Sequence, residues 1–257
     1  MEFVIDAGNS NIVFALHQNG NWLWLDRVDT KANINEVFLQ AYYTDLLIEH
    51  DIPAEAVQQI SISCVVSEIS EVLKDSIWHY FGQHPIFLSP EIFKNLPFNI
   101  PKPYEIGADL VANAFAVHLL HPGNHIIVDF GTALTFTIYT EGKGIEGVTI
   151  APGVKTAIQA LSIQTSKLPV VSVEFPESVI GQNTSHAIQA GVMYGYVGLV
   201  KELLKKIQEE KETIYSCIAT GGLSEFMNPL HDAFTEVDPY LTLEGIRLIG
   251  QYHKTKK

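Results

Sequence analysis

Short apolar runs that alternate with polar residues open the chain, and the arrangement returns near its middle. Residues 2–29 contain three such runs, with Asn19-Gly20-Asn21 between the second and the third. Alternation with a period of two predicts β-strands, and an Asn-Gly pair between two strands predicts a tight hairpin turn. Residues 126–129, 134–140 and 145–150 repeat the pattern. The sequence therefore predicts two halves that each begin with a three-stranded meander.

Apolar residues spaced three and four apart predict helices between and after these strands. In the first half we expect helices over residues 35–50, 68–81 and 110–120, and strands over 57–66 and 86–88. In the second half we expect helices over residues 153–164, 184–210, 223–230 and 241–252, and strands over 215–219 and 234–237. This alternation predicts α/β layers with mixed sheets. We place a domain boundary near His121-Pro122, which separates an N-terminal domain of residues 1–121 from a C-terminal domain of residues 122–257.

Composition narrows the class of protein without naming a function. An apolar fraction of 47% is enough to build a core, and a formal charge of -13 disfavours nonspecific binding to nucleic acid or to an anionic membrane. Cys64 and Cys217 both lie in apolar runs, which is typical of buried thiols. No apolar run is long enough to suggest a membrane span, and no signal segment opens the chain. We therefore expect a soluble cytoplasmic protein.

Candidate chemistry lies where apolar strands run into short polar turns. Asp6-Ala7-Gly8-Asn9-Ser10-Asn11 follows the first strand, and Asp129-Phe130-Gly131-Thr132 follows the strand that opens the second half. A single aspartate of this kind is often a turn residue that bonds its own backbone. Two such turns half a chain apart favour a carboxylate beside a metal-bound phosphate, because Mg²⁺ commonly uses one or two carboxylates together with phosphate oxygens. Thr220-Gly221-Gly222-Leu223 is a third turn, where paired glycines permit close approach of a ligand to the backbone.

In this order, the three turns resemble those of the acetate and sugar kinase, Hsp70 and actin superfamily. That resemblance implies duplicated ribonuclease H-like (actin-like ATPase) domains, each a mixed sheet with flanking helices. Further stretches resemble one branch, type III pantothenate kinase. They are Gly107-Ala108-Asp109, Ala151-Pro152-Gly153, Ile180-Gly181-Gln182-Asn183-Thr184, Gln189-Ala190-Gly191 and Tyr194-Gly195-Tyr196.

The resemblance implies ATP-dependent phosphorylation of pantothenate to 4'-phosphopantothenate, the first step of coenzyme A biosynthesis. It makes Asp109 the catalytic base and Asp129 the ligand of a monovalent cation, K⁺ or NH₄⁺, and it allows Asp6 to hold Mg²⁺. It also implies a homodimer, with pantothenate and ATP as its ligands and no nucleic acid or membrane partner. The implied ATP contacts are Asp6, Ala7, Gly8, Asn9, Ser10, Asn11, Ile12, Val13 and Thr132. The implied pantothenate contacts are Gly107, Ala108, Asp109, Leu110 and Thr184.

Leu110 departs from the family pattern, which usually reads Gly-x-Asp-Arg. Leucine cannot pair with a carboxylate or a phosphate, and losing one charged hydrogen bond costs on the order of 1.5–3 kcal/mol. Either another cation compensates, with Lys102, Lys155 and Lys167 as candidates, or the activity is weak or altered. Two alternatives therefore stay open: a non-catalytic regulatory or accessory relative on the same scaffold, and a kinase of another small alcohol. For Asp109 itself, the alternative to a catalytic base is a helix N-cap.

Two other patterns are interpreted as structural. Gly142-Lys143-Gly144-Ile145-Glu146-Gly147 fits a dinucleotide-binding spacing, but it lies between two expected strands and predicts a hairpin turn. His118, His121 and His125 lie close in sequence without a matching set of acidic residues or cysteines, which disfavours a metal site.

Overall fold

Each half of the chain builds a five-stranded mixed sheet, and the two sheets have the same strand order. A computed structural model describes residues 1–256. The chain divides into two compact units: unit 1 combines residues 1–120 with the segment that begins at Leu241, and unit 2 comprises His121–Tyr240. The orders β3-β2-β1-β4-β5 and β8-β7-β6-β9-β10 correspond strand by strand, which confirms the duplicated actin-like α/β fold.

In unit 1 the sheet is built from a meander followed by two parallel strands. The turn residues Asn19 and Gly20 both have positive φ, 51° and 85°, as a two-residue hairpin with primed geometry requires. The strands are β1 (Glu2–Ala7), β2 (Asn11–Gln18), β3 (Asn21–Asp29), β4 (Gln59–Cys64) and β5 (Ile86–Phe87). The helices are α1 (Glu36–Glu49), α2 (Ser67–Phe81), α3 (Pro90–Phe93), α4 (Ala108–Leu120) and α7 (Leu241–Thr255), with a 3₁₀ turn at Ala54–Ala56.

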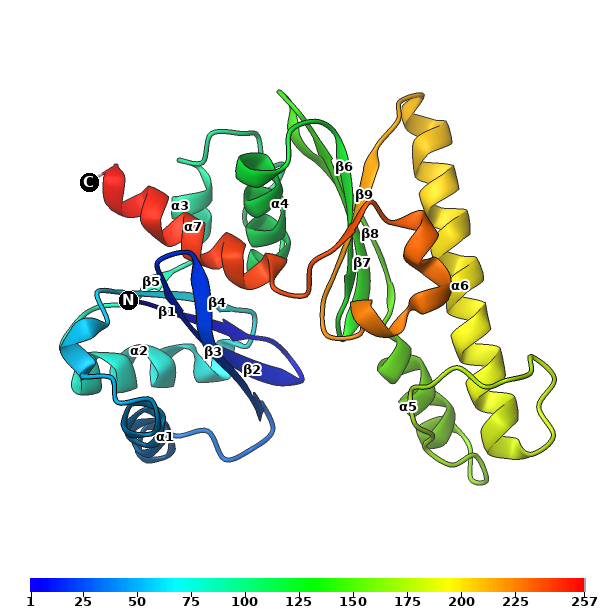
Figure 1. Ribbon diagram of the computed structural model, residues 1–257, viewed down its shortest axis with the longest axis horizontal. Coiled ribbons are helices and arrows are strands. Elements are labelled where there is room, and N and C mark those ends of the chain that lie inside the picture. Colours follow the sequence, from blue (N-terminus) through cyan, green and yellow to red (C-terminus); the bar gives the residue numbers. More distant parts are fainter. Residues whose placement is uncertain (257) are drawn as a thin grey trace. The chain divides into compact units, whose positions relative to one another are not determined.

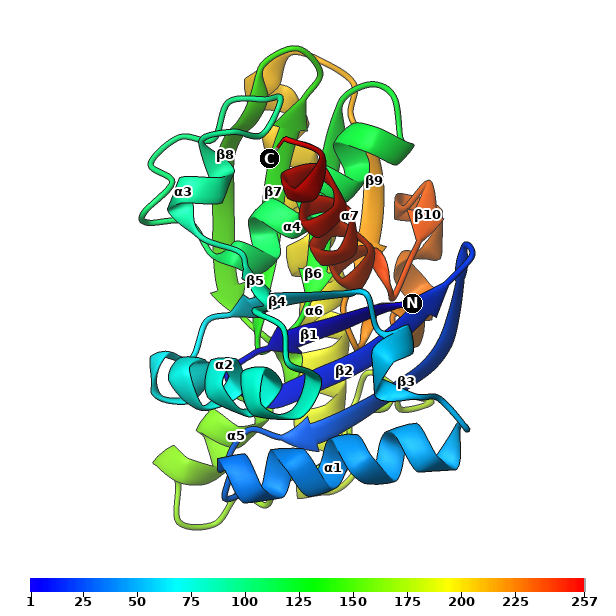
Figure 2. The same ribbon diagram turned by 90° about the vertical axis from the view of Figure 1, so that its left-hand side faces the viewer.

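The two faces of the first sheet have different roles. Phe3, Ile5 and Ala7 alternate along β1 and pack into the apolar cluster formed with α1 and α2 (Figure 1). Because successive strand side chains point to opposite faces, Asp6 lies on the other face. Helices α4 and α7 cover that face, as Figure 2 shows for α7. The polar end of β1 therefore faces away from the apolar core.

The last helix, α7, departs from the domain limits expected from the sequence. We expected residues 122–257 to form one domain, whereas α7 packs within unit 1 against α4, β1 and β4. Buried Arg247 donates to Glu2 Oε2 at 2.9 Å, and its carbonyl accepts from Gln59 Nε2 at 3.2 Å. Gly245 lies against the carbonyl of Ala112, where a Cβ would collide. These contacts join residues far apart in sequence, so local pattern could not reveal them.

In unit 2 the sheet carries its apolar cluster on the face covered by α5 and α6. Ile126, Val128 and Phe130 contribute to this cluster from the central strand. Asp129 lies between Val128 and Phe130 on the strand, so its side chain projects from the other face, as that of Asp6 does in unit 1. The strands are β6 (His125–Phe130), β7 (Ala133–Thr140), β8 (Gly144–Pro152), β9 (Ser216–Thr220) and β10 (Glu236–Val237). The helices are α5 (Val154–Gln164) and α6 (Thr184–Lys211).

The helix expected over residues 223–230 is wrong. The segment forms two 3₁₀ helices, η2 (Ser224–Phe226) and η3 (Asn228–Ala233). Pro229 explains the break, because proline lacks an amide hydrogen and its ring clashes with the preceding helical turn. The Gly142 segment is the expected hairpin between β7 and β8. Within residues 1–256, no helix has both the length and the apolar character to cross a membrane.

Candidate active site

The first polar turn joins β1 to β2 at residues 8–10. Gly8 N donates to Asn11 O at 3.0 Å and closes the turn. Thr30, which follows β3, donates from its amide to Ser10 O at 3.1 Å and from its hydroxyl to Gly8 O at 2.7 Å. The side chains of Asn9, Ser10 and Asn11 are exposed, so the turn presents polar groups and its backbone to a ligand. Thr30 is a supporting residue that sequence reasoning missed, because it lies 22 positions from its partner.

Asp109 lies in the first turn of α4, which begins two residues before the helix expected over residues 110–120. Its Oδ1 accepts from the amide of Leu110 at 2.9 Å. The helix begins at Ala108, so Asp109 is inside the helix and does not occupy the N-cap position. Surrounding protein raises the pKa of the Asp109 carboxyl, and the hydrogen bonds from the backbone amides of Leu110 and Asp109 only partly oppose this effect. A carboxylate with a raised pKa is a stronger proton acceptor than an ordinary aspartate.

Gly107 and Leu110 define the space on either side of this carboxylate. A Cβ on Gly107 would overlap Asp109 Oδ1 and come within 3.7 Å of Leu110 Cγ. A side chain at position 107 would therefore displace the Asp109 carboxylate from this position. Leu110 itself is buried, with 7% of its surface exposed. The position at which the family resemblance leads us to expect arginine is therefore apolar and enclosed in this protein.

The second polar turn joins β6 to β7 in unit 2 and is tied to the start of α5. Gly153 N donates to Thr132 O at 3.0 Å, and the hydroxyl of Thr156 donates to the same carbonyl at 2.7 Å. A Cβ on Gly153 would overlap the carbonyl oxygen of Gly131 and lie 2.5 Å from that of Thr132. Gly153 therefore permits the start of α5 to approach this turn closely. The contacts of Gly153 and Thr156 hold the backbone at Thr132.

The third turn follows β9 and lies directly against Asp129. Gly221 has φ of 88°, and a Cβ there would overlap Asp129 Oδ1 and lie 2.8 Å from Phe130 N. Unit 2 thus brings together two turns that are some 90 residues apart in sequence. The helix that we expected to start at this turn is replaced by η2, a 3₁₀ helix of three residues. An anion site at an α-helix N-terminus is therefore not formed by Leu223 and its successors.

Thr184 is not among the residues of unit 2 that meet at the polar turns around Asp129. It is the first residue of α6 and lines an apolar hollow of about 300 Å³. Leu161, from the second half of α5, lines the same hollow, whereas the Thr132 contacts are at the start of α5. Seven residues of helix separate Val154 from Leu161, or about 10 Å at 1.5 Å per residue. Thr184 and Thr132 are therefore distinct features of this unit.

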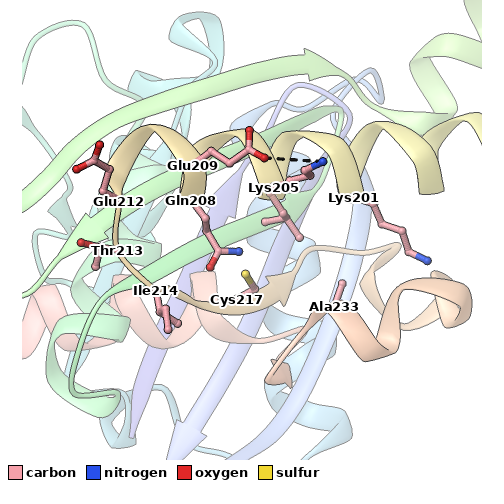
Figure 3. A pocket seen from close by; sticks show the side chains of 10 residues that line it. Lys201, Lys205, Gln208, Glu209, Glu212, Thr213, Ile214, Cys217 and Ala233 are labelled. Atoms are coloured by element: carbon pink, nitrogen blue, oxygen red, sulfur yellow. Dashed lines mark ion pairs between the residues drawn. The ribbon is translucent and has the colours of Figure 1, made fainter.

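A cavity of about 590 Å³ in unit 2 contains none of the candidate residues. It lies between the C-terminal half of α6 and the start of β9, with Lys201, Lys205 and Cys217 among its lining side chains (Figure 3). Asp129 pairs with Thr220 at the other end of β9. Burial raises the pKa of the Cys217 thiol to about 11, which keeps it protonated and unreactive near neutral pH.

The remaining candidate lysines are exposed, and two of the candidate histidines make polar contacts. Lys102 is exposed and lies 3.0 Å from Glu105, whereas Lys155 and Lys167 are exposed in unit 2. His121 lies 3.4 Å from Glu236, and His125 Nε2 lies 3.2 Å from the carbonyl of Pro122. Across residues 1–256, no group of three or more His, Cys, Asp or Glu side chains is arranged to hold a metal ion. His121 and His125 therefore each contact a polar group of unit 2.

Comparison with known proteins agrees with this geometry. A family model described as type III pantothenate kinase matches residues 2–206. A type III pantothenate kinase of Geobacter sp. (strain M21) is 38% identical over 256 residues, which cover 99% of this chain and 100% of the relative.

Two solved structures share the fold at low identity. A Campylobacter jejuni protein thought to be a Baf family transcriptional activator is 21% identical, with a TM-score of 0.59 over 98% of this chain and 99% of that one. Component A of (R)-2-hydroxyglutaryl-CoA dehydratase from Acidaminococcus fermentans is 12% identical, with a TM-score of 0.58 over 100% and 99% of the two chains.

The duplicated sheets, each with a polar turn after its central strand, define the actin-like ATPase fold. The matching family model and the curated relative make the protein a phosphotransferase of that fold. Within that class the chain belongs to the type III pantothenate kinase family.

Proposed function

We propose that this protein transfers the γ-phosphoryl group of ATP to the primary hydroxyl of pantothenate and forms 4'-phosphopantothenate for coenzyme A synthesis. One observation carries the proposal: the family match over residues 2–206 covers Asp6, Asp109 and Asp129. The protein acts as a homodimer in the cytoplasm. Exposed apolar side chains at residues 163–180 of unit 2 support the homodimer, with Ile163 80% and Ile180 75% exposed.

ATP binds through the two polar turns. Residues 6–13 bind its phosphates, as the exposed turn closed by Gly8 and supported by Thr30 suggests. Thr132 contacts ATP from the turn that α5 supports. Asp6 holds Mg²⁺ and Asp129 holds a monovalent cation, K⁺ or NH₄⁺. When bound, these ions neutralise phosphate charge, which is the main requirement of phosphoryl transfer.

Asp109 accepts the proton of the acceptor hydroxyl. Its bond to the amide of Leu110 orients one carboxylate oxygen, and its raised pKa increases its basicity. The family resemblance assigns Gly107, Ala108 and Leu110 of unit 1 to binding of pantothenate, and it assigns the same role to Thr184 of unit 2. The transition state of phosphoryl transfer is loose, so the base needs only to orient the hydroxyl and take the proton late.

The test is an assay of the purified protein with ATP, Mg²⁺ and K⁺, with and without pantothenate. We expect pantothenate-dependent formation of ADP, together with a product one phosphoryl group heavier than pantothenate. Omission of K⁺ should lower the rate. If ADP formation is the same with and without pantothenate, pantothenate is not the acceptor of the phosphoryl group.

Leu110 favours a second candidate, a kinase of another small alcohol that lacks a carboxylate. The buried apolar side chain offers no charge to an anionic acceptor. A panel of small alcohols assayed beside pantothenate separates the two candidates, because the true acceptor gives the highest kcat/KM.

Restoring the family's arginine should increase turnover of pantothenate. We expect Leu110→Arg to raise kcat/KM for pantothenate roughly tenfold to a hundredfold, since one charged hydrogen bond contributes on the order of 1.5–3 kcal/mol. KM for ATP should change little. Leu110→Met is the control, since it keeps size and apolar character. Equal effects of methionine and arginine would show that charge at this position is irrelevant.

The pH dependence of activity should follow the ionisation of the Asp109 carboxyl. Because its pKa is raised, the carboxylate is protonated at pH values where an ordinary aspartate is still ionised. Activity is therefore present above the raised pKa and is lost as the pH falls through it. We expect the acidic limb of kcat/KM for the acceptor to have its midpoint above about 4, the ordinary value for aspartate. A limb at or below that value would contradict the role of Asp109 as the base in this form.

A further inference from the structure

The duplication places the two aspartates in equivalent positions, each beside a hydroxyl on the neighbouring parallel strand. In unit 1, Asp6 on β1 is in register with Ser63 on β4. In unit 2, Asp129 on β6 is in register with Thr220 on β9. Strands β4 and β9 have the same place in the two sheets. Ser63 and Thr220 are therefore equivalent residues of the two halves.

Residues in register on adjacent strands project to the same face of a sheet, with strands about 4.8 Å apart. Ser63 thus shares with Asp6 the face opposite the α1–α2 core, and Thr220 shares with Asp129 the face opposite the α5–α6 core. Unit 2 adds a second such neighbour, because Thr135 on β7 is in register with Asp129. The corresponding residue of unit 1 is Val13, which has no hydroxyl.

These hydroxyls are buried and make no hydrogen bond within the described residues. Ser63 and Thr220 are fully buried, Thr135 is 8% exposed, and the side-chain oxygen of each has no partner. Burial of a hydroxyl without a hydrogen-bond partner is unfavourable, because the group loses its bonds to water and gains none in return. All three hydroxyls are on residues in register with Asp6 or Asp129. This arrangement indicates that the hydroxyls form their hydrogen bonds when a ligand is bound.

We propose that Ser63 and Thr220 are positioning residues that donate hydrogen bonds to Asp6 and Asp129 when these carboxylates hold their cations. Thr135 adds a second donor to Asp129. The proposal rests on the function proposed above, in which Asp6 serves Mg²⁺ and Asp129 a monovalent cation. Carboxylates that ligate metal ions are themselves held by hydrogen bonds, and loss of such a bond lowers metal affinity about tenfold to a hundredfold.

Substitutions in the two units should then weaken the binding of different ions. Ser63→Ala should weaken only the Mg²⁺-dependent interaction, because Ser63 serves Asp6. Thr220→Val and Thr135→Val should weaken only the response to K⁺, because both serve Asp129. Ser63→Thr and Thr220→Ser keep a hydroxyl and should restore most of the affinity.

Thr137 supplies a matched control. It lies on the same face as Thr135, two residues further along β7 and in register with Ile127. Its hydroxyl is also buried without a partner, and 1% of its surface is exposed. Thr137→Val removes the same group from the same sheet without touching an aspartate, so it should leave both ion responses unchanged.

Direct binding by calorimetry tests the proposal, with the full-length protein and a non-hydrolysable ATP analogue as probe. The analogue is titrated at increasing Mg²⁺, and thermal unfolding of the complex is followed with and without K⁺. We expect Ser63→Ala to raise the Mg²⁺ concentration for half-maximal binding about tenfold or more. We expect Thr220→Val to abolish most of the K⁺-dependent rise in unfolding temperature.

Several outcomes would overturn the proposal. These are equal effects of Thr137→Val and Thr220→Val, equal effects of Ser63→Ala on both ions, or no Mg²⁺-dependent binding by the wild type. Binding that follows the expected pattern without turnover of pantothenate supports the positioning role and overturns only the choice of acceptor.

Discussion

Replacing Asp109 by asparagine is expected to lower kcat by at least about a hundredfold, the lower end of what general bases contribute. The asparagine side chain keeps the size of aspartate and an oxygen that can accept from the amide of Leu110. It cannot take a proton from the acceptor hydroxyl. Binding of ATP should remain, because the phosphate turns are formed by other residues.

The same variant should gain stability at neutral pH. Burial raises the pKa of Asp109, so the folded protein binds this proton more tightly than the unfolded chain does. The ionised carboxylate therefore destabilises the fold above the raised pKa, and asparagine removes that cost. The difference should vanish as the pH falls below the ordinary aspartate value, where both states are protonated.

Turnover, binding of a non-hydrolysable ATP analogue and thermal unfolding across pH measure these effects. Asp109→Glu is a useful companion, because it keeps the charge and moves it by one methylene group. Turnover by Asp109→Asn within a few-fold of wild type would reject the catalytic role. A loss of turnover accompanied by loss of ATP binding would assign Asp109 to substrate binding instead.

Substituting Gly221 by alanine is expected to lower kcat/KM for ATP by about a hundredfold or more, the scale for displacing a group by about 1 Å. The added Cβ would overlap Asp129 Oδ1 and crowd the backbone at Phe130. Asp129 and the turn that carries Thr132 must then shift. The positive φ of 88° adds strain of about 1–2 kcal/mol for any residue with a Cβ.

Gly142→Ala separates these two causes. Gly142 also has positive φ, 76°, but nothing lies within 4 Å of the position of its Cβ. Gly142→Ala should therefore lose only the stability that backbone strain costs, and it should keep full activity. Steady-state kinetics with varied ATP, together with thermal unfolding, provide the comparison. If Gly142→Ala impairs ATP use as much as Gly221→Ala, backbone strain and not the contact with Asp129 explains the effect.

The alternation of apolar and polar residues predicted the turns well, because residues close in sequence determine where a strand ends. Alternation of apolar and polar residues sets the strands, and the Gly-containing polar segments after Asp6 and Asp129 can only be turns at their ends. The same locality misled the prediction for residues 223–230. Leu223, Phe226, Met227 and Leu230 have helical spacing, yet Pro229 interrupts the helix and the segment folds as η2 and η3.

Local sequence patterns were sufficient to predict the duplicated α/β fold, the turn at Asp6 with its counterpart at Asp129, and the place of Asp109 near the start of a helix. Residues a few positions apart carry each of these signals. The meeting of distant residues depends on the tertiary structure. It packs α7 with unit 1 through Arg247, brings Gly221 against Asp129, and places Ser63 and Thr220 beside the two aspartates. These neighbours depend on strand register and helix packing across many residues, which no local pattern records.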